Sequence, residues 1–248
     1  MGTFDDAFDT SLSEVEGVKT MDDLRAFVTR LLKRYDLRHA VYHAVSLPTR
    51  IEANPVIVFT YPEQWAAHYI ESNYFAVDPV VGAAATNLLP FDWGRLDRRG
   101  VRTKQLFGEA SEFGIGRQGL TFPIRGPTGD HALFTVTSNA TDTDWEKLRR
   151  MYMRDFQLLA HFVHGKVLEL EHGVTLPLKP LSSREREVLS WAVKGLQNDA
   201  IAHKLGISES AVRAYFLSAR GKLNCVSRSH VLATAVSMRL VGPASGAG

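Results

Sequence analysis

A set of polar and aromatic side chains in the first third of the chain has the types and the spacing to bind a small molecule. Tyr61, Trp65 and Tyr69 recur every four residues, and Asp78 follows, directly before Pro79. An indole N–H only donates hydrogen bonds, an ionised carboxylate only accepts them, and a phenol can do both. A lone tryptophan or tyrosine is more often part of a core, so the prediction depends on the joint spacing.

Apolar patterning predicts the elements that position these residues. Alternation indicates strands over residues 40–47, 55–61, 119–125 and 131–138. A 3.6-residue period indicates helices over residues 20–36, 62–70, 98–113 and 143–171, the last beginning in a capping box from Thr143 to Glu146. Residues 71–96 are expected to form a loop. Strands flanked by helices indicate an α/β or α+β first domain, expected over residues 1–171.

The rest of the chain is expected to be a separate helical domain. Residues 172–180 carry two prolines without periodicity and are predicted to be a linker. A helical domain is expected over 181–241, and 242–248 should be a disordered tail. The expected helices cover residues 182–194, 197–205, 208–223 and 228–240.

Two of these helices have the pattern of a helix-turn-helix. The first ends at Gly206, and Ser208 can cap the second. Such a second helix fits the major groove of DNA. Another capping box, from Ser182 to Glu185, begins the domain.

Charge is distributed unevenly along the chain. Residues 175–248 contain ten Lys or Arg against four Asp or Glu, whereas the remainder contains 19 against 23. The basic part is a candidate for binding a polyanion such as DNA. On charge alone, a solvated basic surface explains the excess equally well.

The basic part also carries a specific pattern. It contains Leu181-Ser-Ser-Arg-Glu-Arg-Glu-Val-Leu, then Gly195, Leu205-Gly-Ile-Ser and Lys222-Leu. This pattern resembles the C-terminal DNA-binding domain of the LuxR family over residues 177–241. The residues expected to contact DNA are Ser210, Arg213, Tyr215, Arg220 and Lys222.

This sequence departs from the family pattern at two places in that domain. Leu196 and Gln197 replace the usual Lys and Thr, and Tyr215 and Ser218 replace the usual His and Asn. These departures put individual phosphate contacts in doubt, but not the fold.

The first part resembles the acyl-homoserine-lactone-binding domain of LuxR-type regulators. The resemblance rests on the Tyr61 to Asp78 spacing, on Trp93, and on Gly119-Leu-Thr-Phe-Pro-Ile. It implies a ligand site formed by Tyr61, Trp65, Tyr69, Asp78, Trp93 and Thr135.

The resemblance also implies a role for each side chain. The Trp65 indole suits the lactone carbonyl, Asp78 suits the ligand's amide N–H, and the Tyr61 hydroxyl suits the amide carbonyl. Trp93 and Tyr69 would supply aromatic contacts around the ring. Thr135 would lie near a substituent of the acyl chain, and Gly119 would allow close approach of the backbone.

The family's architecture follows from the two resemblances together. They imply an α+β fold with an α-β-α sandwich sensor around an antiparallel sheet, plus an all-α helix-turn-helix domain. They further imply a homodimer that binds palindromic double-stranded DNA, with RNA polymerase as a partner. An acyl-homoserine lactone would be the effector, with no cofactor, and the long helix 143–171 is a candidate dimer surface.

Other functions are open or disfavoured. A regulator of the same build could answer a different small molecule or none. An acyl-transfer or lactone-hydrolysing enzyme is disfavoured, because the sequence has neither G-x-S-x-G nor H-x-x-x-x-H. Residues 1–170 also lack the pattern of a phosphorylated receiver domain, which needs an acidic pocket and an aspartate at the end of a parallel strand.

Two motifs resemble a dinucleotide site and a metal site, but their surroundings in the sequence do not fit those functions. Gly114 to Gly119 fits G-x-G-x-x-G, but a helix precedes it and a strand follows, the reverse of a dinucleotide site. His161 and His164 have no further metal ligands.

Composition fits a cytoplasmic protein. The single cysteine, Cys225, excludes an internal disulfide. Charges interrupt every apolar run, so a membrane span is not expected. The acidic N-terminus does not have the form of a signal peptide.

Overall fold

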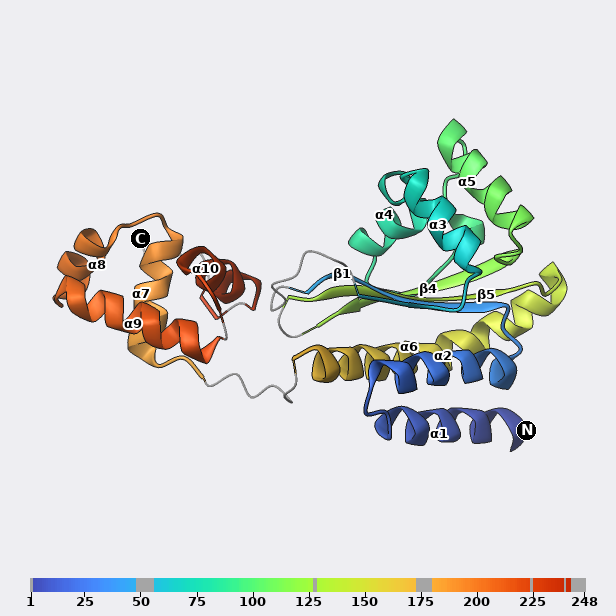
Figure 1. Cartoon of the computed structure of the whole chain (residues 1–248), viewed down its shortest axis with the longest axis horizontal. Helices are drawn as coiled ribbons and strands as arrows, with labels where there is room; N and C mark the ends of the chain where they lie inside the picture. Colours follow the sequence, from blue (N-terminus) through green and yellow to red (C-terminus); the bar gives the residue numbers. More distant parts are fainter. Residues whose placement is uncertain are drawn as a thin grey trace. The chain divides into compact units, whose positions relative to one another are not determined.

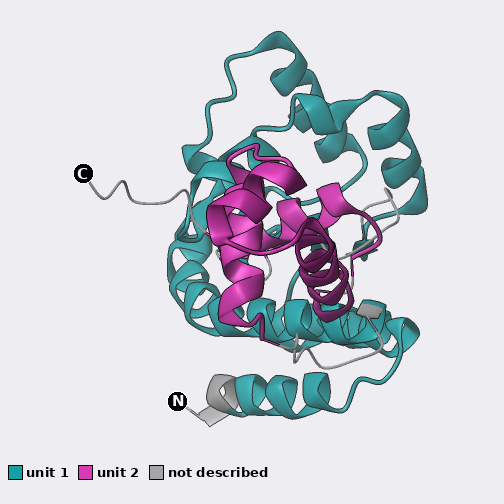
Figure 2. Ribbon diagram, turned by 90° about the vertical axis from the view of Figure 1, so that its left-hand side faces the viewer, with its two compact units in different colours: residues 1–46, 54–126, 131–174 teal, residues 47–53, 127–130, 175–248 magenta. Residues whose placement is uncertain are grey.

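The structure, a computed structural model, describes residues 2–47, 56–126, 129–172, 180–223, 225–238 and 240–241. The chain divides into two compact units (Figure 2). The first combines a β-sheet with helices, and the second is helical. Residues 173–179 of the predicted linker and the predicted tail 242–248 lie outside the described residues.

Within the described residues, five strands form one antiparallel sheet in the order β2-β1-β5-β4-β3. They are β1 (His39–Ser46), β2 (Val56–Phe59), β3 (Phe91–Asp92), β4 (Gln118–Arg125) and β5 (His131–Ser138). The predicted antiparallel sheet is confirmed. Strand β3 was not predicted, because a two-residue strand is too short for alternation to reveal.

Helices cover both faces of the sheet (Figure 1), so the predicted α-β-α sandwich is confirmed. Phe122 and Phe134 lie on the face toward the long helix, where the ring of Phe156 is 6.0 and 5.8 Å from theirs. Because side chains alternate along a strand, Thr121 and Thr135 face the other layer. One layer contains α1 (Gly2–Glu16), α2 (Met21–Tyr35) and α6 (Asp142–His172), and the other α3 (Glu63–Glu71), α4 (Pro79–Thr86) and α5 (Val101–Glu112).

The outer edge of β4 is only partly covered. Strand β3 pairs with Leu120 and Thr121. Pro123 lies beyond that pairing, opposite Leu133 of β5. Its ring nitrogen carries no hydrogen to donate to a further strand.

The expectation of a loop over residues 71–96 is wrong. This segment contains η1 (Tyr74–Ala76), α4, β3 and η2 (Trp93–Arg95). Helix α4 begins where Asp78 Oδ1 accepts the backbone N–H of Val80 at 2.7 Å, with Pro79 in the first turn. These elements are too short to show a period.

Helix α1 was not predicted, because its buried stripe is small and partly polar. Ala7, Ser11 and Val15 are buried at four-residue spacing. The helix is held to α2 by Arg34, which donates to Ser11 at 2.8 Å and to Glu14 at 2.9 Å. Apolar periodicity alone does not reveal such a helix.

Helix α6 is capped two residues before the predicted position. The hydroxyl of Thr141, not that of Thr143, accepts the N–H of Asp144 at 3.3 Å and donates to its carboxylate at 2.7 Å. The predicted capping box from Thr143 to Glu146 is therefore wrong. Neither α6 nor any other helix in the described part of the chain is long and apolar enough to cross a membrane.

The second unit has the predicted helix-turn-helix. Gly206 ends the first helix of the motif with φ of 63°, and Ser208 accepts the N–H of Ala211 at 3.2 Å to begin the second. The apolar core includes Val188, Ile201 and Val212. The helices are α7 (Ser183–Val193), α8 (Asn198–Leu205), α9 (Glu209–Lys222) and α10 (Arg228–Ser237).

Candidate ligand site and DNA interface

The structure brings the four predicted head-group residues together. Trp65 and Tyr69 on α3 have their rings 5.9 Å apart, and Tyr61 and Tyr69 pack against the same apolar cluster as Trp65. The Tyr69 hydroxyl donates to Asp78 Oδ2 at 2.8 Å. Tyr69 was predicted as an aromatic contact, and the structure adds that it orients Asp78.

Asp78 is the acceptor of this cluster. Burial raises its pKa, while the hydrogen bonds from Tyr69 and Val80 act in the opposite direction. Burial and the nearby Asp78 in turn raise the pKa values of the Tyr61 and Tyr69 hydroxyls. Both phenols therefore keep their protons and act as donors.

Two donors beside Asp78 are unused. Among the described residues, neither the Trp65 indole N–H nor the Tyr61 hydroxyl has a hydrogen-bond partner. Trp65 is only 3% exposed and lies between the rings of Tyr74 and Phe113. Both donors are therefore available to a bound molecule.

Glu109 holds α3, η1 and α5 together around Trp65. It accepts hydrogen bonds from Tyr74, from His68 at 2.6 Å and from Gln105 at 2.8 Å. These bonds lower the pKa of Glu109 to about 2. Spacing in the sequence does not reveal this carboxylate, because its partners come from three separate elements.

Trp93 and Thr135 meet through a residue that the sequence analysis did not select. The Trp93 indole donates to Thr121 Oγ1 at 3.0 Å, and that oxygen lies 2.9 Å from Thr135 Oγ1. The Trp93 ring covers Gly119, where an added Cβ would lie 2.1 Å from a ring atom. Alternation along β4 places Thr121 on the same face as Gly119, but its pairing with Thr135 depends on the strand register.

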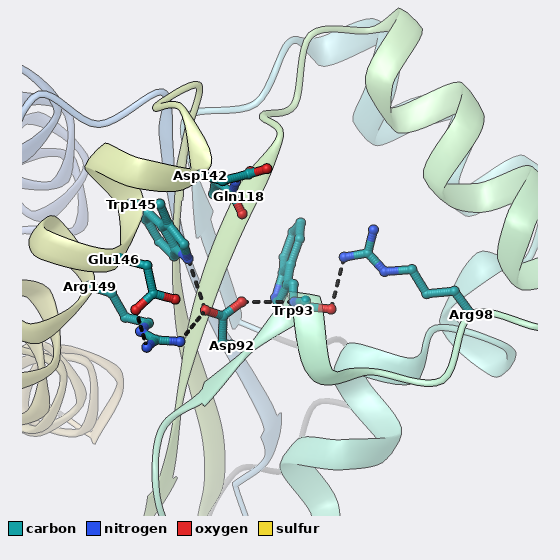
Figure 3. A network of polar contacts seen from close by, with 9 residues as sticks. Asp92, Trp93, Arg98, Gln118, Asp142, Trp145, Glu146 and Arg149 are labelled. Atoms are coloured by element: carbon teal, nitrogen blue, oxygen red, sulfur yellow. Dashed lines mark hydrogen bonds and ion pairs between the residues drawn. The ribbon is translucent and has the colours of Figure 1, made fainter.

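Asp92 joins the Trp93 segment to α6 (Figure 3). Its carboxylate accepts from the Trp145 indole at 2.8 Å, from Arg149 at 3.2 Å and from the Gly94 N–H at 2.8 Å. The carboxylate is nearly buried, which strengthens these bonds. The position of Trp93 is thereby fixed by the first turns of α6.

Two family models match this chain, one in each unit. A model described as autoinducer binding domain matches residues 20–167, and one described as bacterial regulatory proteins, luxR family, matches residues 179–235. The chain belongs to the LuxR family of quorum-sensing transcription regulators.

Relatives and solved structures agree with this assignment. Transcriptional activator protein RaiR of Rhizobium etli is 41% identical over 183 residues, which is 73% of this chain and 75% of RaiR. CarR of Pectobacterium carotovorum is 26% identical over 88% of this chain and 92% of its own. The crystal structure of Escherichia coli SdiA matches with a TM-score of 0.66 at 21% identity, covering 94% of this chain and 97% of SdiA. The named relatives are transcriptional activators, so this LuxR-family regulator is a transcription factor rather than an enzyme.

The exposed face of α9 is the candidate DNA interface of the regulator. Ser210 and Arg220 are exposed as predicted, and Tyr215 is half-buried against the core. Arg213 is exposed and forms a 3.1 Å ion pair with Glu209. Leu217, 60% exposed on the same face as Arg213, was not selected from the sequence.

Lys222, predicted to contact DNA, forms an ion pair within the second unit. Its ammonium lies 2.8 Å from the carboxylate of Glu185, which also accepts the Ser218 hydroxyl at 2.7 Å. Glu185 is 3% exposed and belongs to the predicted capping box, which is confirmed. A phosphate contact by Lys222 stays a prediction, and it would draw the ammonium away from a buried carboxylate.

The ion pair makes a pH-dependent contribution to stability. Burial alone would raise the pKa of Glu185, but hydrogen bonds from Lys222 and Ser218 lower it from 4.5 to about 2. Because the folded-state pKa lies below the unfolded one, the pair stabilises above pH 4.5 and is lost as the pH falls toward 2.

We expect Glu185→Gln to destabilise the second unit by about 3 kcal/mol at neutral pH and to flatten its stability profile over that acidic window. Urea unfolding of the full chain, followed by hydrogen exchange in α7 and α9, measures both. Glu187→Gln is the matched control, because Glu187 is exposed and paired with Arg184. Equal effects of the two substitutions would contradict the role given to Glu185.

Proposed function

We propose that the first unit binds an acyl-homoserine lactone between the sheet and α3–α5. The observation that supports this most is the pair of unused donors, Trp65 and Tyr61, beside the acceptor Asp78. The Trp65 indole donates to the lactone carbonyl, Tyr61 donates to the amide carbonyl, and Asp78 accepts the amide N–H. Trp93 and Thr135 contact the ring and the acyl chain.

Binding is coupled to DNA recognition by mass action. A ligand that binds the folded state and not the unfolded state stabilises it by about 2.7 kcal/mol at a hundredfold excess over Kd. A ligand that accepts from the Trp65 indole and from the Tyr61 hydroxyl adds hydrogen bonds worth about 0.5–1.5 kcal/mol each. The ligand-bound regulator then accumulates and occupies its promoters, where RNA polymerase is its partner.

The DNA-bound form is a homodimer on a palindromic site. A two-fold protein matches a two-fold site, with one α9 in each major groove. Helix α6 is the candidate dimer surface, because Leu158 is exposed and Phe162, four residues later, is half-buried. Both side chains would be covered by the same helix of a second copy.

The ligand is tested by thermal unfolding of the full chain with synthetic acyl-homoserine lactones of short, medium and long acyl chains. A concentration-dependent rise in Tm without hydrolysis of the lactone is expected. No rise with any chain length would contradict the proposed ligand, and turnover would indicate an enzyme. Mass spectrometry of the small molecule that copurifies from the native host identifies the natural effector.

A second ligand class has one specific observation in its favour. The structure of SdiA in complex with octanoyl-rac-glycerol matches this chain with a TM-score of 0.63 at 20% identity. An acylglycerol shares the acyl chain, but its acyl carbonyl belongs to an ester, so it has no amide N–H for Asp78. Octanoylglycerol therefore belongs in the same titration, where tighter binding than any lactone would favour this class.

The DNA interface predicts a sequence-dependent role for Arg213. Its surface ion pair with Glu209 is weak enough to exchange for guanine. Arg213→Ala should cost about 1–3 kcal/mol on the specific site and little on scrambled DNA.

Binding of both DNAs at two salt concentrations measures this difference. Arg184→Ala is the charge-matched control, since Arg184 is also exposed and paired with a glutamate on its own helix. An equal loss on both DNAs would show that Arg213 contacts phosphate alone.

A further inference from the structure

His43 is a nearly buried polar residue that none of the roles above uses. It is 8% exposed, and it has no hydrogen-bond partner among the described residues. Its neighbours are apolar: it lies opposite Ile57 on β2 and Leu133 on β5, and its ring is 5.4 Å from that of Phe75. Both ring nitrogens are therefore available to a bound molecule.

The contact with Phe75 of η1 places His43 on the face of the sheet that carries Thr135. Burial lowers the pKa of His43 to about 4. The ring is therefore neutral at physiological pH, with one nitrogen donating and the other accepting. It can pair with a carbonyl or with a hydroxyl group.

The strand register places His43 in line with the head-group cluster. Tyr61 packs on His39, with ring centroids 5.2 Å apart. The next residues on the same face of β1 are Val41 and then His43. Val41 lies opposite Thr135. Since a strand rises about 3.3 Å per residue, His43 lies about 13 Å along the strand from His39.

The surface between these points suits an acyl chain. Phe59 lies opposite Val41 and Ile57 lies opposite His43, and both side chains are more than a third exposed. Thr135 is the competing candidate for a polar contact, but its hydroxyl already pairs with Thr121, which also accepts the Trp93 indole. His43 has both ring nitrogens available.

We propose that His43 is a specificity-determining contact, which hydrogen-bonds an oxo or hydroxyl group on the acyl chain of the ligand. This inference rests on the proposed lactone site. It assigns to the far part of that site a preference for oxygenated chains over plain ones.

The test compares Kd values of the full chain for acyl-homoserine lactones of equal chain length that are either plain or carry one oxo or hydroxyl group, placed in turn from C3 to the far end of the chain. The wild-type protein should prefer an oxygenated ligand about tenfold, as expected for one hydrogen bond in a buried site. His43→Leu should remove the preference while the plain lactone binds at least as well. His43→Gln, which keeps a donor and an acceptor, should retain part of it.

His203→Leu, the same change at an exposed histidine of the second unit, is the matched control and should leave the ratio unchanged. An unchanged ratio in His43→Leu, or a wild-type preference for the plain chain, would overturn the role of His43 while leaving the lactone site intact. A wild-type protein that binds no lactone would overturn the lactone site together with this inference.

Discussion

Asp78→Asn is expected to remove the response to acyl-homoserine lactones at concentrations that saturate the wild-type regulator. Asp78 accepts from Val80 and from Tyr69 and is proposed to accept a third hydrogen bond from the ligand. An asparagine amide has a single oxygen, so it cannot accept all three. The expected loss is about 1.5–3 kcal/mol, or about 10- to 150-fold in affinity.

The substitution isolates ligand binding from folding. Asparagine caps helices about as well as aspartate, so α4 should persist. A reporter dose–response curve and the ligand-induced rise in Tm measure the effect. Asp97→Asn, the same change at an exposed carboxylate paired with Arg99, should have none. If Asp78→Asn responds like the wild type, Asp78 does not contact the ligand.

Gly119→Ala should disable the sensor through Trp93. The added Cβ would lie 2.1, 2.5 and 2.6 Å from three atoms of the indole ring, so the ring must move. Trp93 is nearly buried and its N–H is bonded to Thr121, so movement breaks that bond and disturbs packing. Overpacking of this kind costs about 1–3 kcal/mol or more.

Thermal unfolding and lactone titration detect the damage. Gly108→Ala is the matched control, because nothing lies within 4 Å of its added Cβ on α5 and alanine favours the helix. Combining Gly119→Ala with Trp93→Leu should recover stability but not ligand binding. Full binding by the single Gly119→Ala variant would show that the position of Trp93 is not critical.

Features set by neighbouring residues could be predicted from the sequence. The Ser182 to Glu185 capping box and the left-handed Gly206 depend on a few consecutive positions, and both are present. The Tyr61 to Asp78 spacing likewise selected four residues that do lie together. Local pattern failed where elements were very short, as in η1 and β3, or where a buried helix stripe was small, as in α1.

Partners distant in sequence could not be predicted. Thr121 meets Thr135 only through the register of β4 and β5, and Lys222 meets Glu185 only when α9 packs on α7. A pattern that identifies Lys222 as basic and helical does not reveal a buried carboxylate 37 residues earlier in the chain. His43 was missed similarly, because its lack of a partner is a property of the folded sheet.

Pro123 has a consequence for how copies of the protein can associate. An uncovered strand edge invites another chain to add a strand, which is a common route to aggregation. On β4 that route is obstructed, because β3 covers Leu120 and Thr121 and Pro123 offers no N–H beyond them. Sheet extension on this side is therefore disfavoured, both for misassembly in a crowded cell and for specific pairing. Helical surfaces such as α6 offer self-association another route, without fibre formation.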